Sequence, residues 1–160
     1  MKIKSLLLVS ILTSIVGCSD EQTSADFTMP NPKLTPGDTM PVTLEELCTV
    51  GYTKKVRNVP DRIRKQVFQS YGLAHNRDQW CDRPQGCELD HLISLELGGS
   101  NDIKNLWPEP YQGVDLNAHT KDRLENKLHK MVCKGEISLE QAQQEIATDW
   151  VKAFHKYIEK

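Results

Sequence analysis

Apolar side chains recur at helical spacing in three stretches of the chain and predict three long helices. The first is expected over about Pro60–Tyr71, because a proline suits its first turn and a glycine follows its end. Asn117 is a suitable cap for the second helix, which should run to about Cys133. Ser138 and Gln141 have the spacing of a capping box for the third. The expected apolar faces are Ile63, Val67, Phe68 and Tyr71 in the first helix, Leu124, Leu128, Met131 and Val132 in the second, and Leu139, Ala142, Ile146, Trp150, Phe154 and Tyr157 in the third.

Between the first and second helices, the pattern changes to one that predicts a β-hairpin. Leu89–Leu97 is expected to form the first strand and its exit, and Gly98–Asn101 supplies turn residues. A short return strand should begin within Ile103–Trp107 and end at Pro108 and Pro110, because proline cannot donate a ladder hydrogen bond. Helices that flank such a hairpin give an α+β fold.

The amino terminus has the layout of an export signal. Two lysines precede the apolar run Leu6–Val16, which is too short to span a bilayer as a mature helix. Ile15–Cys18 resembles a bacterial lipobox, in which Cys18 becomes the lipidated first residue, and ordinary cleavage near the same place is the alternative. Ser19 after the cysteine fits the outer membrane. We therefore expect an exported protein that a lipid anchors to the membrane on the periplasmic side of the bacterial envelope.

The length of 160 residues and the composition predict one folded domain. Residues 1–18 would be the signal that ends at the lipidated cysteine. Residues 19–41 are rich in Asp, Ser, Thr and Pro and are expected to be a disordered tether. Residues 42–160 would then hold the domain.

The five cysteines become an even set of four once Cys18 is used for lipidation. Export to an oxidising compartment favours two disulfides, for which three pairings exist. We favour Cys81–Cys87, which closes a short loop, and Cys48–Cys133, which ties the front of the domain to its helical back. The lack of a C-x-x-C pair in the sequence disfavours a zinc ribbon.

The net charge of −2 is not the bulk signature of a nucleic-acid-binding protein. Positive charge is nevertheless concentrated in one stretch of the chain. A solvated helix face explains such a cluster when it stands alone, whereas beside a phosphodiesterase site it would form a rim that contacts the nucleic-acid backbone. The cluster consists of Lys54, Lys55, Arg57, Arg62, Arg64, Lys65, Arg77 and Arg83.

An Asp-His pair, a Gly-Gly turn and a later asparagine lie close together in Glu88–Trp107, and His119 follows at the start of a predicted helix. Carboxylate and imidazole side chains around a turn are what a small metal site needs. This arrangement resembles the HNH, or ββα-metal, nucleases, whose core is a β-hairpin packed on one helix. The resemblance implies that Asp90 and His119 bind a divalent metal, that His91 is the general base and that Asn105 braces the loop.

Two features of this stretch depart from the simplest pattern. Consecutive strand residues point to opposite faces, so Asp90 and His91 line one site only if the strand twists or ends at His91. The interval from Asn105 to His119 is longer than in many compact HNH motifs, which leaves Asn117 as the alternative last ligand. His119 heads a polar ridge on the second helix, a position that favours an active-site or surface role over a core one.

The resemblance implies an endonuclease that hydrolyses phosphodiester bonds with the help of a metal and leaves 5′-phosphate and 3′-hydroxyl ends. One carboxylate and one imidazole fit Mg²⁺ or Mn²⁺ and also accommodate Zn²⁺ or Ni²⁺. Lys121 and Arg123, on the first turns of the helix, would clamp a phosphate of the substrate. DNA is the expected partner and RNA the alternative, and neither a base-reading element nor a protein partner is evident.

Two other functions compete with this interpretation. A non-catalytic envelope lipoprotein could keep the fold and use it to bind metal or nucleic acid, and a missing ligand would favour it. A toxin-like effector domain would need delivery modules, which are not expected in so short a chain. A nuclease that meets nucleic acid in the periplasm fits the residues better.

Overall fold

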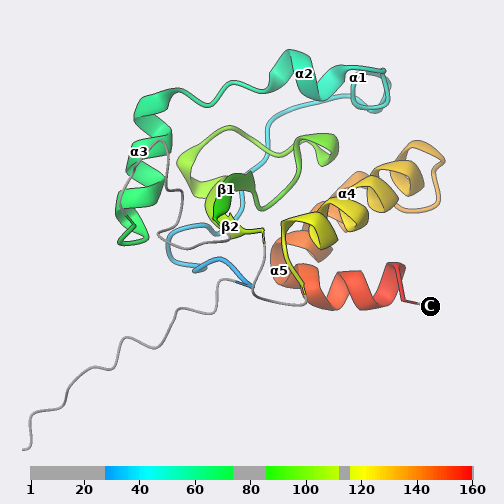
Figure 1. Cartoon of the computed structure of the whole chain (residues 1–160). Coiled ribbons are helices and arrows are strands. Elements are labelled where there is room, and N and C mark those ends of the chain that lie inside the picture. The colour runs from blue at the N-terminus through cyan, green and yellow to red at the C-terminus, as the bar shows by residue number, and fades with distance from the viewer. Residues whose placement is uncertain (1–27, 74–85, 112–115, 160) are drawn as a thin grey trace, which may run out of the picture.

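The computed structural model describes residues 28–73, 86–111 and 116–159 of the chain. Within these ranges the fold is α+β, as predicted, with five α-helices and one two-stranded antiparallel sheet (Figure 1). The elements are α1 (Leu44–Leu47), α2 (Tyr52–Val56), α3 (Asp61–Ser70), β1 (Cys87–His91), the 3₁₀ turns η2 (Leu95–Leu97) and η3 (Ile103–Asn105), β2 (Leu106–Pro110), α4 (Ala118–Cys133) and α5 (Leu139–Tyr157). The hairpin lies between α3 and the packed pair of α4 and α5. None of the described helices is long and apolar enough to cross a membrane.

The helix ends follow the local chemistry of the sequence. α4 begins after Asn117, whose side chain accepts the Thr120 backbone N–H at 3.3 Å. α5 begins after Ser138, which accepts the Gln141 backbone N–H at 3.0 Å. The predicted helix over Pro60–Tyr71 is confirmed to within one residue at each end, since it corresponds to α3. The short α2 was not expected.

The main core forms where α4 packs against α5. The predicted apolar faces of both helices are largely confirmed, although Met131, Leu139 and Tyr157 at their edges are only partly buried. Full burial of a side chain as large as leucine or phenylalanine contributes about 1.5–3 kcal/mol, so this interface forms a firm support for the hairpin. The buried members are Leu124, Leu128, Val132, Ala142, Ile146, Trp150 and Phe154.

A disulfide between Cys48 and Cys133 ties the end of α1 to the end of α4, with the two Cα atoms 5.8 Å apart. This predicted pairing is confirmed. The link joins residues 85 positions apart, and the chain-entropy account of disulfides gives such a loop about 4–5 kcal/mol of stabilisation. Cys87 is also disulfide-bonded, and its expected partner Cys81 lies outside the described residues.

Residues 28–41, here termed the strap, lie against the domain, which corrects the prediction that a tether extends to residue 41. The buried hydroxyl of Thr35 donates to the Leu106 carbonyl at 2.9 Å. Thr39 forms an isolated β-bridge with Gly99. The strap has a polar composition, but these long-range bonds satisfy and fix its backbone.

The first hairpin strand is shorter than predicted. β1 ends at His91, whereas Leu89–Leu97 was expected, and residues 92–105 form a loop that contains η2 and η3. Asp90 is the cross-strand partner of Trp107. Consecutive side chains within a strand point to opposite faces. Because β1 ends at His91, this rule does not have to hold for the Asp-His pair, and the end of the strand agrees with the expectation for it.

The return strand ends at Pro110, as predicted, but it runs through Pro108. β2 is Leu106–Pro110, and Pro108 pairs with Leu89, so the prediction that Pro108 also ends the strand was wrong. Each strand of a two-stranded sheet has one open edge, where a missing N–H removes no ladder bond.

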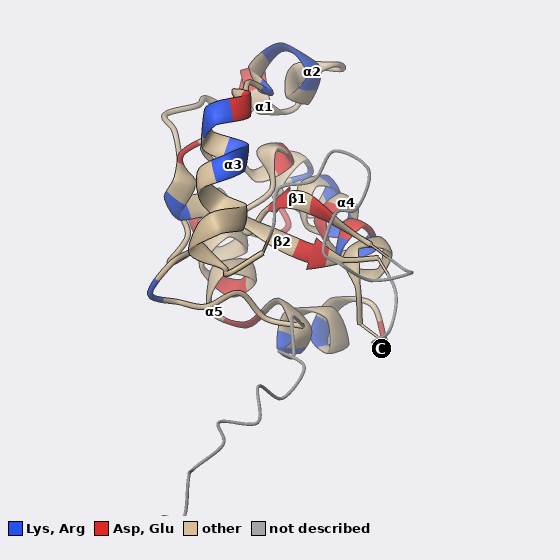
Figure 2. Ribbon diagram, turned by 60° about the vertical axis from the view of Figure 1, so that its left-hand side comes forward, with Lys and Arg blue, Asp and Glu red and all other residues tan. Residues whose placement is uncertain are grey.

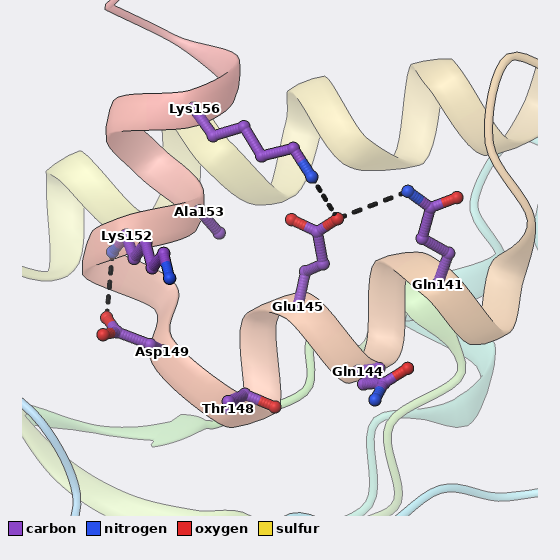
Figure 3. Close-up of a pocket in the computed structure, with 8 residues that line it drawn as sticks. All are labelled: Gln141, Gln144, Glu145, Thr148, Asp149, Lys152, Ala153 and Lys156. Carbon is purple, nitrogen blue, oxygen red and sulfur yellow. Dashed lines mark hydrogen bonds and ion pairs between the residues drawn. The ribbon is translucent and has the colours of Figure 1, made fainter.

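α5 bends at Asp149, whose backbone is extended at φ −165° and ψ 89°. The Asp149 side chain accepts the Lys152 backbone N–H at 2.9 Å and so caps the second half of the helix. A hollow beside the bend is lined by α5 residues alone (Figure 3). Glu145 in this hollow pairs with Lys156 at 2.5 Å, and none of the residues predicted for the site lies there.

Candidate metal and catalytic site

Three carboxylates lie on one face of the hairpin. Glu88 and Asp90 alternate along β1 and therefore point to the same side, and Glu109 in β2 is the direct partner of Glu88. One carboxylate oxygen from each residue lies within 4.8 Å of the other two. We call Glu88, Asp90 and Glu109 the carboxylate group. Figure 2 shows these acidic positions in red on both strands.

Lys121 enters the carboxylate group from α4. It is 1% exposed, and its Nζ donates to Asp90 Oδ2 at 2.6 Å and to the His91 carbonyl at 2.8 Å. Nζ also donates to Glu125, one turn further along α4, and Glu109 Oε2 lies 3.9 Å away. One buried ammonium therefore balances several carboxylates, and removal of one partner from such a network is costly.

The carboxyls around Lys121 differ in how readily they ionise. Burial opposes ionisation of Asp90, but the charge and hydrogen bond of Lys121, together with smaller contributions from Glu109 and His91, outweigh this effect and hold the pKa of Asp90 at about 2. Burial raises the pKa of Glu125 to about 7, although Lys121 partly offsets it. Burial also raises the pKa of Glu109 well above its usual value, with Lys121 opposing and the Asp90 charge reinforcing the shift. Asp90 is thus the permanent anion, and Glu109 keeps its proton to a higher pH than an exposed glutamate.

Glu109 is the member of the carboxylate group whose bonding is incomplete. It is 1% exposed, and neither of its carboxyl oxygens meets a hydrogen-bond donor among the described residues. One of these oxygens lies within 4.8 Å of an Asp90 carboxylate oxygen. Buried oxygens without donors are unfavourable, and carboxylate oxygens are the ligands that Mg²⁺ and Mn²⁺ prefer. The donor set of the carboxylate group therefore fits the predicted divalent metal.

His91 ends β1 with its imidazole 2% exposed. Its Nε2 lies 3.2 Å from Oδ1 of Asn101. Two other bonds orient the Asn101 amide, since Nδ2 donates to the Val56 carbonyl at 2.8 Å and Oδ1 accepts the Asn58 backbone N–H at 3.1 Å. An amide oxygen can only accept, so Nε2 of His91 carries the imidazole proton and Nδ1 keeps the lone pair of a base.

The surroundings of His91 keep the imidazole neutral. Burial lowers the pKa of His91, and the positive charges of Arg57 and Lys121 act in the same direction. The Asp90 charge and the bond to Asn101 oppose this shift without cancelling it. The neutral form is the one that a general base requires at neutral pH.

The loop between the strands is held by Asn105, which is fully buried. Its Oδ1 accepts the Ile93 backbone N–H at 2.9 Å, and its Nδ2 donates to the Ile93 and Ser100 carbonyls, each at 2.9 Å. These are the backbone contacts expected from the resemblance. Gly99 allows the close approach, because a Cβ there would lie 1.7 Å from the Ile93 carbonyl oxygen. Gly98 before it adopts a left-handed φ of 73°.

His119 does not join the carboxylate group. Its exposed imidazole stacks on the ring of Tyr111 with the centroids 5.6 Å apart, and the Tyr111 hydroxyl donates to Glu88 Oε2 at 3.1 Å. Asn117, the alternative ligand, caps α4 with its side chain. The ring of Tyr111 therefore lies between His119 and the carboxylate of Glu88.

Neither Lys121 nor Arg123 lies where the predicted phosphate clamp requires. Lys121 is buried and bonded to carboxylates, and the Arg123 guanidinium lies 5.4 Å from the ring centroid of Phe154 in α5. Arg57, at the end of α2, is exposed and its charge acts on His91. Among the described residues, Arg57 is therefore a basic residue close enough to His91 to contact a phosphate bound there.

Sequence reasoning missed Glu109, Glu125 and Asn101. Glu109 lies between two prolines, which argued against a strand at this position, and only the strand places Glu109 opposite Glu88. Glu125 follows Lys121 by one helical turn, a spacing that is also common in solvent-exposed ion pairs and therefore does not indicate burial. Asn101 was assigned only to the turn, and no local signal linked it to the histidine ten residues before it.

Comparison of the chain with protein-family models, with curated proteins and with solved structures found no match in any of the three. The geometry of the carboxylate group and of His91 therefore carries the functional argument.

Proposed function

We propose that the protein is a metal-dependent endonuclease of the HNH type, with His91 as the general base. The observation that carries this proposal is the state of His91, which is buried, neutral and oriented by Asn101 beside the carboxylate of Asp90. One imidazole nitrogen is committed to Asn101, and the other can accept a proton. General-base catalysis requires this arrangement.

In the proposed reaction, Nδ1 of His91 removes a proton from a water molecule as the water oxygen attacks phosphorus. The imidazolium that forms keeps its Nε2–H bond to Asn101, and the Asp90 charge stabilises it. The bond between phosphorus and the 3′ oxygen breaks, and the leaving oxygen takes a proton from solvent water, so the products carry a 5′-phosphate and a 3′-hydroxyl. Asn105 holds the loop so that these side chains keep their places.

The proposal assigns the divalent metal to the carboxylate group in place of the predicted pair of Asp90 and His119. Three carboxylates favour a hard cation, so Mg²⁺ or Mn²⁺ suits this set better than Zn²⁺ or Ni²⁺. When bound, such an ion supplies positive charge that stabilises the phosphate and the leaving oxygen. Lys121 beside the group limits the negative charge that the ion has to neutralise.

The substrate in this proposal is nucleic acid, with DNA expected and RNA the alternative. Arg57 lies near His91 and would contact a phosphate of the backbone. Further basic residues occur on α2 and α3 (Figure 2). Contacts of this kind hold the backbone without reading the bases, so we expect little sequence specificity.

Export and the lipid anchor are part of the proposal. The predicted signal and the lipidation site Cys18 lie outside the described residues. The Cys48–Cys133 disulfide supports an oxidising compartment such as the periplasm. A nuclease held there would act on nucleic acid that enters the envelope.

The test compares the oxidised protein with His91→Ala and with a control, His155→Ala, whose exposed imidazole lies on α5. Each is incubated with plasmid DNA and with RNA in Mg²⁺, Mn²⁺, Zn²⁺ or EDTA. We expect metal-dependent cleavage by the parent and the control, and a loss of about 10²–10⁴-fold in His91→Ala, the usual contribution of a general base. Equal cleavage by all three proteins would remove His91 from the mechanism.

The metal ligands are tested separately from cleavage, by calorimetric titration with Mn²⁺. Glu109→Gln should weaken Mn²⁺ binding by about tenfold or more, because it removes one carboxylate ligand. His119→Ala should leave the affinity unchanged. The reverse result would return the metal to the predicted pair.

One observation favours a second function. Lys121 already neutralises part of the carboxylate group, as it would in a structural ion-pair network that needs no metal. The protein would then be a non-catalytic module that binds nucleic acid through its basic residues. A folded protein that slows the migration of DNA in a mobility-shift gel but cuts it with none of the metals would establish this alternative.

A further inference from the structure

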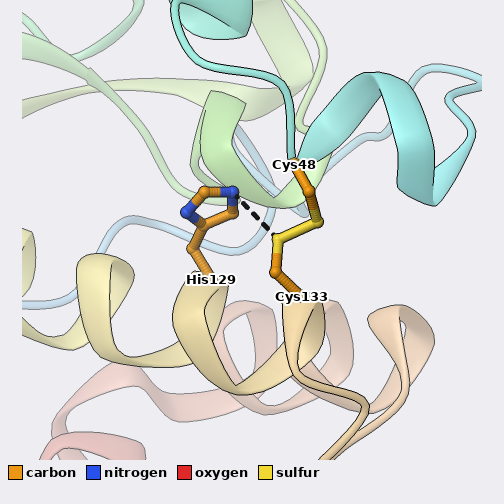
Figure 4. Close-up of side chains that lie close together, drawn as sticks. All are labelled: Cys48, His129 and Cys133. Atoms are coloured by element: carbon orange, nitrogen blue, oxygen red, sulfur yellow. Dashed lines mark hydrogen bonds between the residues drawn. A yellow bond between two sulfur atoms is a disulfide. The ribbon is translucent and has the colours of Figure 1, made fainter.

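A second cluster of metal-ligating side chains lies near the end of α4, away from Lys121 (Figure 4). Cys133 and His129 are one helical turn apart on α4, and Cys48 reaches them from the end of α1. His129 Nε2 lies 3.4 Å from Cys133 Sγ, and the three ligand atoms all lie within 4.8 Å of one another. Two sulfurs and one imidazole nitrogen therefore converge at one place.

This cluster is accessible and held in position. Cys48 and Cys133 are exposed, and His129 is half-buried. Nε2 of His129 lies 3.2 Å from the Leu47 carbonyl, which keeps the imidazole turned toward the sulfurs. Leu47 itself is buried in the core, so the segment that carries Cys48 is fixed against α4.

We propose that Cys48, Cys133 and His129 form a Zn²⁺ site when the Cys48–Cys133 disulfide is reduced. A dithiol or phosphine reductant supplies two electrons to the S–S bond, and each sulfur gains a proton. Zn²⁺ then displaces the two thiol protons and binds both thiolates and Nε2. For this, the imidazole gives up its bond to the Leu47 carbonyl and exchanges its proton from Nε2 to Nδ1 through solvent. A fourth position remains for water or another ligand.

The spacing of the side chains agrees with this chemistry. Bond lengths of about 2.3 Å for Zn–S and 2.0 Å for Zn–N place sulfur and nitrogen about 3.5 Å apart in a tetrahedral site. The present separation of Cys133 Sγ and His129 Nε2 is 3.4 Å. Reduction lets the two sulfurs move apart, and the ion can then take the place of the covalent link between α1 and α4.

This site is independent of the proposed nuclease activity. Thiolates and imidazole prefer Zn²⁺, whereas the carboxylate group prefers a hard cation. The metal would hold α1 to α4 under reducing conditions, where the disulfide is absent. Its loading can therefore be measured without any nucleic acid.

The test uses the full-length protein, reduced with a phosphine that is then removed, and titrated with Co²⁺ as a coloured substitute for Zn²⁺. We expect thiolate-to-cobalt charge-transfer bands and the visible bands of tetrahedral Co²⁺, both abolished by an equimolar amount of Zn²⁺. The oxidised protein should show neither. His129→Ala should weaken Co²⁺ binding by about tenfold or more and shift the visible bands, whereas His155→Ala should match the parent.

Cysteine variants assign the sulfur ligands. The double variant Cys48→Ser/Cys133→Ser should lose the bands, whereas Cys87→Ser should keep them. If reduction unfolds the chain, Zn²⁺ should restore the helical circular dichroism of the parent but not of His129→Ala. A reduced parent that binds Co²⁺ no better than the oxidised protein overturns the proposal, and so does a His129→Ala variant that titrates like the parent.

Discussion

The side-chain oxygen of Asn101 lies 3.2 Å from Nε2 of His91 and determines which imidazole nitrogen carries the proton. Asn101 is in turn oriented by the carbonyl of Val56, 45 residues earlier in the chain. The proposed general base is thus positioned by a turn residue and by the backbone at the end of α2.

Replacement of Asn101 by alanine should release the imidazole from its single tautomer. Nδ1 of His91 would then carry the proton in part of the population, and cleavage should fall by about 10–100-fold, as is usual when the partner of a functional histidine is lost. Nitrogen-15 NMR of the His91 ring measures the tautomer directly. Asn126→Ala, at an exposed position on α4, is the control. A tautomer that does not change would show that Asn101 is not the orienting residue.

Cleavage should decline in acid because His91 has to be neutral. The ordinary histidine pKa is 6.5, and burial, with Arg57 and Lys121, lowers the pKa of His91 below it. The rate should therefore stay constant as the pH falls to 6.5 and decrease only below that value. A profile of rate against pH checks this, and a midpoint above 6.5 would contradict it.

The lowered pKa of His91 also predicts a contribution to the free energy of unfolding. This contribution is present above pH 6.5 and is lost as the pH falls through the folded-state pKa, since protonation favours the unfolded chain.

Lys121→Met should destabilise the protein by about 3–5 kcal/mol, because the half-buried carboxylate of Asp90 and the buried carboxyls of Glu109 and Glu125 would lose the cation that they share. Lys127→Met, at an exposed position on the same helix, is the matched control and should change the unfolding free energy by less than about 0.5 kcal/mol. Denaturant unfolding near neutral pH measures both. Equal losses in the two variants would mean that the network around Lys121 contributes nothing to stability.

The cost of Lys121→Met should also shrink in acid. Burial raises the pKa of Asp90, but Lys121, which contributes most among the opposing groups, helps to lower it from 3.8 to about 2 in the folded state. A lowered carboxyl pKa gives stability that is present above the unfolded value and disappears as the pH falls through the folded one. The parent and Lys121→Met should therefore converge in stability between these two pH values.

Gly99→Ala should disrupt the loop that carries Asn105. The added methyl would lie 1.7 Å from the Ile93 carbonyl oxygen, so the backbone must move, and we expect a loss of about 3 kcal/mol or more together with reduced cleavage. Gly51→Ala is the comparison, since its methyl would meet no atom within 4 Å and only its left-handed φ of 82° is unfavourable, by about 1–2 kcal/mol. Thermal unfolding of both variants measures the difference. A smaller loss in Gly99→Ala than in Gly51→Ala would show that the loop relaxes freely.

The helices of this fold are predictable from the sequence because their signals are local. Asn117 and Ser138 bond to backbone groups three residues away, and the apolar stripes of α4 and α5 are set by spacing alone. The Asp-His pair and Asn105 stand out in the sequence because their motif is short, and Asn105 makes the backbone bonds of a residue that braces the loop.

The remaining features depend on contacts between distant residues. Lys121 and Glu125 are charged, so a helix position alone suggests exposure, and only the carboxylates of the hairpin explain their burial. The strap has the composition of a linker, and its order depends on bonds such as that of Thr35 to Leu106, 71 positions away. His119 has the residue type and the helix position of a ligand, but the ring of Tyr111 separates it from the carboxylates.

The strap gives the amino-terminal segment a mechanical connection to the site. The Met40 N–H donates to the Gly98 carbonyl, and the Ser100 N–H donates to the Asp38 carbonyl, so the strap and the loop are joined edge to edge. Trp150 of α5 binds the Thr28 carbonyl at the point where the described chain begins. Tension applied ahead of residue 28 would load these bonds in shear and be carried by the loop and α5 before it reached α1. If the protein is tethered to a membrane, as proposed, a pulling force on its amino-terminal segment would therefore act first on the loop that holds Asn105.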